Sequence, residues 1–234
     1  DAVYSDSMEP LVEESETDPI SLHGIMHKTR ELIIKSQFVD KLKVPLFIAR
    51  PTLIYGLNDP HNGYGPNRFL RQALNNERIS IFGKGEELRD HVNIDDVGRL
   101  ISEAVCHKTS GILNIASGKT ISFRDIAEKI VFLTNPSIEI VETPRVGEMP
   151  HNGFRPFDIK STTDYFPNFE YMDISEGLRK LVHDKQYSSY FVISVAFCIK
   201  FDQISAGSPP PVTLAMLLES SLPSQIPAIK FPEY

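Results

Sequence analysis

The hydrophobic positions of the chain follow two kinds of spacing in turn. From Ser21 onward the apolar residues recur about every 3.6 residues, which predicts a helix of about five turns that ends near Asp40. The apolar run over residues 44–50 is short and nearly continuous, as is typical of a strand buried on both faces of a parallel sheet. Because the two patterns alternate along the chain, we expect an α/β fold with a mostly parallel sheet.

The same patterns predict the remaining elements as far as residue 182. Ser122 is placed to open a helix, and Asp95 with Asp96 is typical of the first turn of another, where carboxylates favour the free N–H groups. We expect helices over residues 68–75, 95–105, 123–133 and 175–182, and strands over residues 78–82, 113–116 and 138–141.

The C-terminal segment, residues 185–234, has a different composition from the rest. Residues 186–234 contain only five charged side chains, and six prolines fall between Pro209 and Pro232. The apolar run over residues 190–199 is shorter than the roughly 20 residues that a helix needs to cross a bilayer. We expect an atypical low-charge tail that packs poorly or is foreign to the domain, with an interaction segment as the alternative.

Composition and charge narrow the class of protein. Of 234 residues, 41% are hydrophobic and 24% charged, which is typical of globular domains. The net charge of −7 and the lack of a dense Lys/Arg run argue against nucleic acid as a partner. Two cysteines make no disulfide framework, and the first residues lack a secretory pattern, so we expect a cytoplasmic protein without membrane association.

Several short motifs occur in an order that one enzyme family shares. Over about residues 1–183 the chain resembles the extended short-chain dehydrogenases/reductases, which include nucleotide-sugar epimerases and dehydratases. The motifs are AVY (2–4), HGIMH (23–27), RPTLIYG (50–56), FGKG (82–85), RDHVNIDD (89–96), NIASG (114–118), RVG (145–147) and RPFD (155–158).

The resemblance implies two domains and a cofactor. Residues 1–58 and 90–118 would belong to a Rossmann domain that binds NAD or NADP, and residues 59–89 and 119–184 to a smaller α/β domain that binds the substrate. The glycine-rich dinucleotide fingerprint is missing, because the glycines at 83 and 85 lack a third at the right offset. The motifs at the start of the chain match the middle of a family member. We therefore expect an N-terminally truncated chain that holds the C-terminal part of a Rossmann-like parallel sheet.

His23 and His27 stand where the family has a catalytic tyrosine and, four residues later, a lysine. Residues at this spacing share one helix face, so the geometry of the pair survives the substitution. An imidazole exchanges protons near neutral pH, which would let His23 act in proton transfer and His27 donate to the nicotinamide ribose. The alternatives are a degenerate site and a zinc site. The zinc motif HExxH has glutamate where this chain has Gly24, and no third ligand is apparent, so we expect no metal.

The resemblance also implies further contacts for the ligands. Pro51 and Thr52 would lie beside the nicotinamide at the carboxyl end of a strand. Arg89 and Arg145 would bind the nucleotide diphosphate, and Arg155 is a third candidate, since guanidinium groups bind phosphate oxygens bidentately. The alternative is that the three arginines form ordinary surface ion pairs.

The implied function is hydride and proton transfer on a nucleotide-activated sugar in the intact protein. Leu53 stands where many sugar-nucleotide enzymes have a substrate-binding asparagine, and the sequence separates neither one sugar nucleotide from another nor NAD from NADP. The family also implies a homodimer formed through the helix of the His23 pair. A non-catalytic nucleotide-sugar-binding or scaffolding protein is the alternative, and we expect this chain alone to be inactive.

Overall fold

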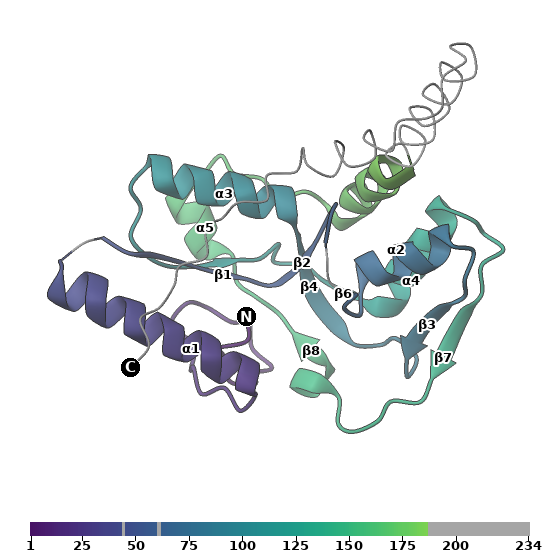
Figure 1. The fold of residues 1–234 in the computed structure, drawn as a ribbon, viewed down its shortest axis with the longest axis horizontal. Coiled ribbons are helices and arrows are strands. Elements are labelled where there is room, and N and C mark those ends of the chain that lie inside the picture. Colours follow the sequence, from purple (N-terminus) through teal and green to yellow (C-terminus); the bar gives the residue numbers. More distant parts are fainter. Residues whose placement is uncertain (44, 60–61, 187–234) are drawn as a thin grey trace, which may run out of the picture. The chain divides into compact units, whose positions relative to one another are not determined.

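A computed structural model describes residues 1–186 apart from residue 44 and residues 60–61 (Figure 1). Within the chain, Asp1–Gln186 forms one compact unit. The predicted tail lies, beyond residue 186, outside the described residues. No helix in the described part of the chain is long and apolar enough to span a membrane.

The strands of this unit pair mostly in parallel. Strand β1 (Phe47–Pro51) pairs with β5 (Gly111–Ile115), β2 (Leu53–Tyr55) with β4 (Leu88–Asn93), and β3 (Ile79–Phe82) with β7 (Ile140–Thr143), all in parallel. Strand β4 also pairs in parallel with β8 (Phe154–Arg155) and antiparallel with β6 (Thr120–Ser122). The predicted α/β fold with mostly parallel pairing is confirmed.

Every predicted helix is present, with shifts at some ends. Helices α2 and α4 lie side by side, while α3 contacts β1 and α5 contacts β5 (Figure 1). A π-helical segment, Ser36–Lys41, continues α1, and a 3-10 helix spans Pro150–Gly153. The α-helices are α1 (Leu22–Lys35), α2 (Pro66–Leu74), α3 (Ile94–Cys106), α4 (Phe123–Leu133), α5 (Lys160–Tyr165) and a final helix over residues 174–186.

Side-chain caps explain where three of these helices begin. The hydroxyl groups of Ser21 and Ser122 accept from the backbone N–H groups of Gly24 and Asp125, respectively. The prediction that α3 begins at Asp95 is wrong by one residue, because the side chain of Asn93 caps the helix and accepts from the N–H of Asp95. A cap oxygen satisfies one of the N–H groups that a first helical turn leaves free.

The strand predictions differ from the structure mainly in their ends. Strand β1 begins three residues later than predicted and includes Pro51, and β7 is shifted by two residues toward the C-terminus. Strand β4 was not predicted, since four of its six residues are Arg89, Asp90, His91 and Asn93. All four are buried, so this polar strand lies inside the molecule.

Three hydrophobic clusters hold the elements together. The largest joins α2, β3, α4 and the final helix through fully buried residues such as Phe69, Ile126 and Leu178. The second joins β5 and α3 through Leu113 and Leu100, and the third packs the first residues of the chain against Phe157. The proposed division between a cofactor domain and a substrate domain stays a prediction.

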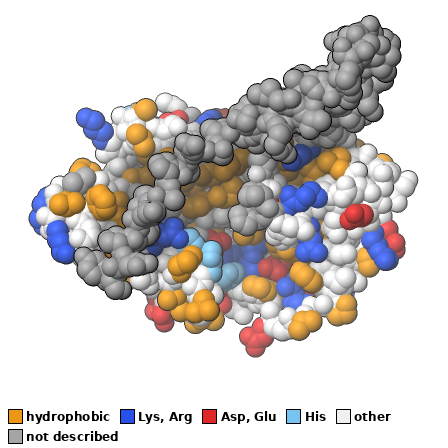
Figure 2. All heavy atoms as spheres, viewed as in Figure 1, with side chains coloured by type: hydrophobic (Ala, Val, Ile, Leu, Met, Phe, Trp, Pro, Cys, Tyr) orange, Lys and Arg blue, Asp and Glu red, His pale blue; other side chains and the backbone are white. Residues whose placement is uncertain are grey.

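Helix α1 differs from the other helices because it buries only Gly24. Its apolar stripe, which predicted the helix correctly, is exposed: Leu22 is 86% and Ile33 58% accessible. Figure 2 shows hydrophobic side chains at the surface in the part of the view where Figure 1 draws α1. Within the described part of the chain, no hydrophobic cluster includes this stripe.

Replacing Ile126 by Ala should destabilise the fold by about 2–5 kcal/mol, because the side chain is fully buried and its removal leaves a cavity in the largest cluster. Urea denaturation followed by circular dichroism measures this change. Phe132→Ala on the same helix is the control, since Phe132 is 81% exposed and its loss should change stability little. Equal losses in the two variants would contradict the assigned core.

Candidate functional site

Four of the predicted site residues line a single cavity of about 510 Å³. Helix α1 supplies His23 and His27, while Pro51 ends β1 and Thr52 follows it. The N–H of Thr52 donates to the carbonyl of Ile115 at 3.0 Å, which ties the end of β1 to the end of β5. Two segments far apart in sequence thus meet at the carboxyl edge of a parallel strand pair, where open α/β sheets bind ligands.

The two histidines contact each other across one helical turn. Their ring centroids are 4.4 Å apart and the rings are nearly perpendicular. His23 is exposed and His27 half-buried. Burial, followed by electrostatic repulsion from His23 and Arg30, lowers the pKa of His27 below its usual value. This shift favours the neutral imidazole, which offers one N–H donor and one acceptor.

Gly24 allows α1 to approach the first residues of the chain. A Cβ atom added at Gly24 would lie 2.2 Å from the carbonyl oxygen of Ala2 and 2.6 Å from Cβ of Pro19. No side chain fits at this position, so the glutamate of a zinc motif has no place here. Among the described residues no group of three or more His, Cys, Asp or Glu side chains could hold a metal ion.

An ion pair between the buried Arg50 and the half-buried Glu31 fixes α1 against β1. Arg50 donates through Nε to Oε1 of Glu31 at 2.9 Å and through Nη2 to Oε2 at 2.6 Å. Its Nη1 donates to the hydroxyl of Tyr4 at 2.8 Å, and this hydroxyl donates to Oδ1 of Asn114 at 2.6 Å. Arg50 is 5% exposed. Since Glu31 lies one turn after His27 and Arg50 directly precedes Pro51, the pair positions both sides of the cavity.

Asp90 positions Thr52, which lines the cavity. Its Oδ1 accepts from the Thr52 hydroxyl at 3.2 Å and from the N–H and hydroxyl of Ser117 at 2.9 Å and 3.1 Å. Burial raises the pKa of Asp90, and hydrogen bonds from Ser117 and Thr52 oppose this shift. Because the Thr52 hydroxyl donates to Asp90, its oxygen can accept a hydrogen bond from a ligand.

Two of the candidate phosphate-binding arginines meet at one carboxylate. The Nη2 atom of Arg145 donates to Glu87 at 2.9 Å, and Nη2 of Arg89 donates to the other oxygen of Glu87. Arg89 also donates to the carbonyl of Pro150 at 2.6 Å. Burial lowers the pKa of Arg89, while Glu87 acts in the opposite direction. Glu87 is buried, so this contact is not one of the surface ion pairs that the sequence left open as the alternative.

Arg155 holds the first residues of the chain. It is 1% exposed, and its terminal nitrogens donate to the carbonyl oxygens of Asp1, Tyr4 and Ser5 at 3.0–3.1 Å. Burial lowers its pKa to about 10. These contacts give Arg155 a structural task, and its role in substrate binding stays a prediction.

Sequence reasoning did not single out three residues that matter at this site: Arg50, Glu87 and His151. His151 lines the cavity of the two histidines and contacts Asp6 at 2.5 Å. None of the three candidate arginines lines that cavity. Of these three residues, only Glu87 could have been predicted from the sequence. Residues two apart in an extended segment lie on the same side, and Arg89 follows Glu87 at this distance.

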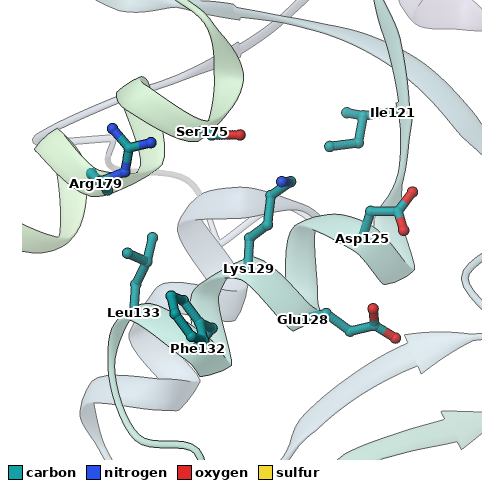
Figure 3. A pocket seen from close by; sticks show the side chains of 8 residues that line it. All are labelled: Ile121, Asp125, Glu128, Lys129, Phe132, Leu133, Ser175 and Arg179. Atoms are coloured by element: carbon teal, nitrogen blue, oxygen red, sulfur yellow. The ribbon is translucent and has the colours of Figure 1, made fainter.

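A larger cavity, of about 660 Å³, lies between α4 and the final helix. Lys129 and Phe132 project from α4, while Ser175 and Arg179 come from the other helix (Figure 3). It contains none of the predicted site residues, and three of its charged side chains, Asp125, Glu128 and Arg179, are exposed. The smaller cavity is therefore the better candidate for chemistry.

Comparisons with known proteins show which family the chain resembles. Residues 1–116 match the model of the NAD dependent epimerase/dehydratase family. Over 151 residues the chain is 28% identical to a UDP-N-acetyl-alpha-D-glucosaminuronate decarboxylase of Bacillus cytotoxicus, with 59% of this chain and 46% of that protein covered. Over 120 residues it is 28% identical to the dTDP-D-glucose 4,6-dehydratase of Dictyostelium discoideum, with 51% and 27% covered.

The fold is that of solved nucleotide-sugar enzymes. The crystal structure of a UDP-glucose 4-epimerase with UDP-glucose from Thermotoga maritima superposes with a TM-score of 0.70 at 24% identity. This match covers 80% of this chain and 61% of the epimerase. The chain thus spans about half the length of the first curated relative and less than two thirds of the epimerase.

Replacing Glu31 by Ala should destabilise the protein by about 3–5 kcal/mol, because it leaves the buried Arg50 guanidinium without its counter-charge. Chemical denaturation measures the loss. The control is Lys119→Ala, which breaks an exposed pair with Asp173 and should cost at most about 1 kcal/mol. A loss for Glu31→Ala no larger than that of the control would contradict the anchoring role of the pair.

His91 should make stability depend on pH. Its Nδ1 faces the carbonyl of Arg89 at 3.3 Å, and burial lowers its pKa from 6.5 to about 4. Between these values the unfolded chain binds a proton that the folded protein does not. The free energy of unfolding should therefore fall by up to about 3 kcal/mol as the pH drops through this range.

Urea denaturation between pH 7 and pH 4 tests this dependence. His91→Phe should flatten the pH dependence, whereas replacement of the exposed His107 by Phe should leave it unchanged. An equally steep pH dependence in His91→Phe would show that other groups cause it.

Proposed function

We propose that the whole protein, of which residues 1–116 match the NAD dependent epimerase/dehydratase family, acts on a nucleotide-activated sugar with NAD or NADP. The observation that carries this proposal is the cavity in which His23, His27, Pro51 and Thr52 come together. These are the residues that match the family's catalytic and cofactor positions. The names of the relatives, which are a UDP-sugar decarboxylase and a dTDP-sugar dehydratase, support the substrate class.

His23 is the proposed proton-transfer group. An imidazole can accept a proton from a sugar hydroxyl and return it near neutral pH. His23 is exposed on the cavity side of α1 and contacts His27, so it can reach a ligand without rearrangement of the helix. His27, being neutral, would act as a hydrogen-bond partner for a ribose hydroxyl.

The residues at the end of β1 fit a bound nicotinamide. Pro51 presents an apolar ring, and the Thr52 oxygen can accept a hydrogen bond because its own hydrogen is directed to Asp90. NAD or NADP, when bound, supplies a hydride acceptor and donor. The chain's own residues would hold the ring at the carboxyl edge of β1, orient the sugar and move the proton at His23.

Arg89 and Arg145 are the proposed diphosphate-binding groups. Guanidinium groups bind phosphate oxygens with two parallel N–H donors, and both arginines converge on one point at Glu87. The proposal therefore places the reacting sugar between the histidine cavity and this arginine pair, with His151 close to both.

A nucleotide-sugar-binding protein without turnover is the second candidate. It is favoured by the neutral state of His27, because the lysine that the family has at this position supplies a cation that lowers the pKa of the catalytic tyrosine. Without a cation there, a site of this geometry can bind ligands and lack the group that activates a proton donor.

Turnover assays on the whole protein separate the two candidates, because we expect the 234 residues alone to be inactive. With NAD and UDP-glucose, dTDP-glucose or GDP-mannose, we expect product formation that His23→Ala lowers by at least about 100-fold. Absorbance at 340 nm and chromatography of the products provide the readout. The matched control is His107→Ala, which changes an exposed histidine that does not line the cavity.

The other outcomes are also informative. Binding of the sugar nucleotide without product, together with product formation by the variant His23→Tyr/His27→Lys, would establish the non-catalytic candidate. Absence of both binding and turnover for every sugar nucleotide, beside an active relative as positive control, would overturn the proposal.

A further inference from the structure

Arg89 and Arg145 share one acidic partner, and that partner lies inside the molecule. Each arginine donates a hydrogen bond through Nη2 to a different carboxylate oxygen of Glu87, and the distance from Nη2 of Arg145 to its acceptor oxygen is 2.9 Å. Glu87 is only 5% exposed. Both carboxylate oxygens therefore already bind the guanidinium groups that we propose for the nucleotide diphosphate.

Two N–H donors of the arginine pair have no acceptor among the described residues. Nη1 of Arg89 and Nε of Arg145 are buried and have no hydrogen-bond partner among the described residues. Buried N–H groups without acceptors are costly, and native proteins leave few of them. One carboxylate thus supplies fewer acceptor sites than the two guanidinium groups can use, whereas a phosphate or diphosphate supplies more.

The charge of Glu87 has opposite effects on the free and the ligand-bound protein. In the free protein it stabilises two guanidinium groups that would otherwise be buried close together without a counter-charge. Toward an incoming anion the same carboxylate is a like charge at the binding point, which weakens association. A ligand phosphate can bind both arginines only by taking over donors that Glu87 holds.

We propose that Glu87 is an internal counter-ion that occupies the arginine pair in the free protein and competes there with the phosphate groups of the ligand. This inference rests on the proposed function, since it takes the ligand to carry a diphosphate. Binding exchanges one anionic partner for another. Glu87 therefore lowers the affinity for phosphate-bearing ligands and leaves the affinity for uncharged ligands unchanged.

The test compares three probes, UDP, uridine and inorganic pyrophosphate, by calorimetric titration of the full chain. Glu87→Gln keeps the shape of the side chain and one acceptor oxygen, but it removes the charge and replaces the other acceptor with an NH2 group. We expect UDP and pyrophosphate to bind this variant about tenfold more tightly than the wild type, and uridine to bind both equally. Glu87→Met, which fills the same space, is the second variant should Glu87→Gln fold poorly.

Glu86→Gln is the matched control. Glu86 is the neighbouring residue, is exposed, and accepts from the backbone N–H of Lys84 at 2.8 Å, so its loss removes the same charge outside the arginine pair. Its affinities should equal those of the wild type.

Three results would overturn the counter-ion proposal, the proposed function, or both. Unchanged or weaker binding of UDP and pyrophosphate by the folded Glu87 variants would overturn the proposal and assign Glu87 the task of orienting the arginines. Tighter pyrophosphate binding with no UDP binding by any variant would support the counter-ion and overturn the nucleotide part of the proposed function. Absence of binding of both probes to every variant would overturn both.

Discussion

The candidate site depends on the ion pair between the buried Arg50 and the half-buried Glu31. Glu31 lies on α1 one turn after His27, and Arg50 is the residue before Pro51, so this one contact sets the rotation of the helix over the end of β1. Removing two charges from water is costly, and the pair persists because Arg50 also donates to Tyr4 and to the carbonyl of Glu13. A helix that buries only Gly24 gains little from hydrophobic packing, which leaves this polar anchor as its main connection to the sheet.

The elements that the sequence predicted are those whose apolar residues recur with a regular period. Helix α4 was predicted over its full length, since Ile126 and Ile130 face the core one turn apart and Ser122 caps the first turn. Strand β4 could not be predicted in this way, because its buried positions are polar and are satisfied by contacts with distant segments. Asp90, for example, is held by Thr52 and Ser117. The short strands β2, β6 and β8 lack the length that a period needs.

The candidate site also has a part that the sequence predicts and a part that it does not. The convergence of His23 and Pro51 on one cavity follows from the resemblance to a known family, since the motifs give the order of the elements around the sheet. The partners of the arginines do not follow from it. Several carboxylates lie near Arg145 in the sequence, and the choice of Glu87 depends on the path of the loop between β7 and β8, which no local pattern fixes. For Gly24 no sequence pattern indicated importance, yet the structure requires a glycine there because the carbonyl oxygen of Ala2 comes too close for any side chain.

The balance of positive and negative charge around Arg89 explains which arginines remain able to bind an anion. Among the described residues, the guanidinium groups of Arg89, Arg145 and Arg155 lie near two paired carboxylates, Glu87 and Asp6. Each buried guanidinium needs either a counter-charge or a full set of acceptors. The terminal nitrogens of Arg155 donate to backbone carbonyls, which fixes the side chain in place, although its Nε atom has no acceptor among the described residues. Arg89 and Arg145 share a single carboxylate and also keep donors without acceptors, so an anion can still stabilise this pair.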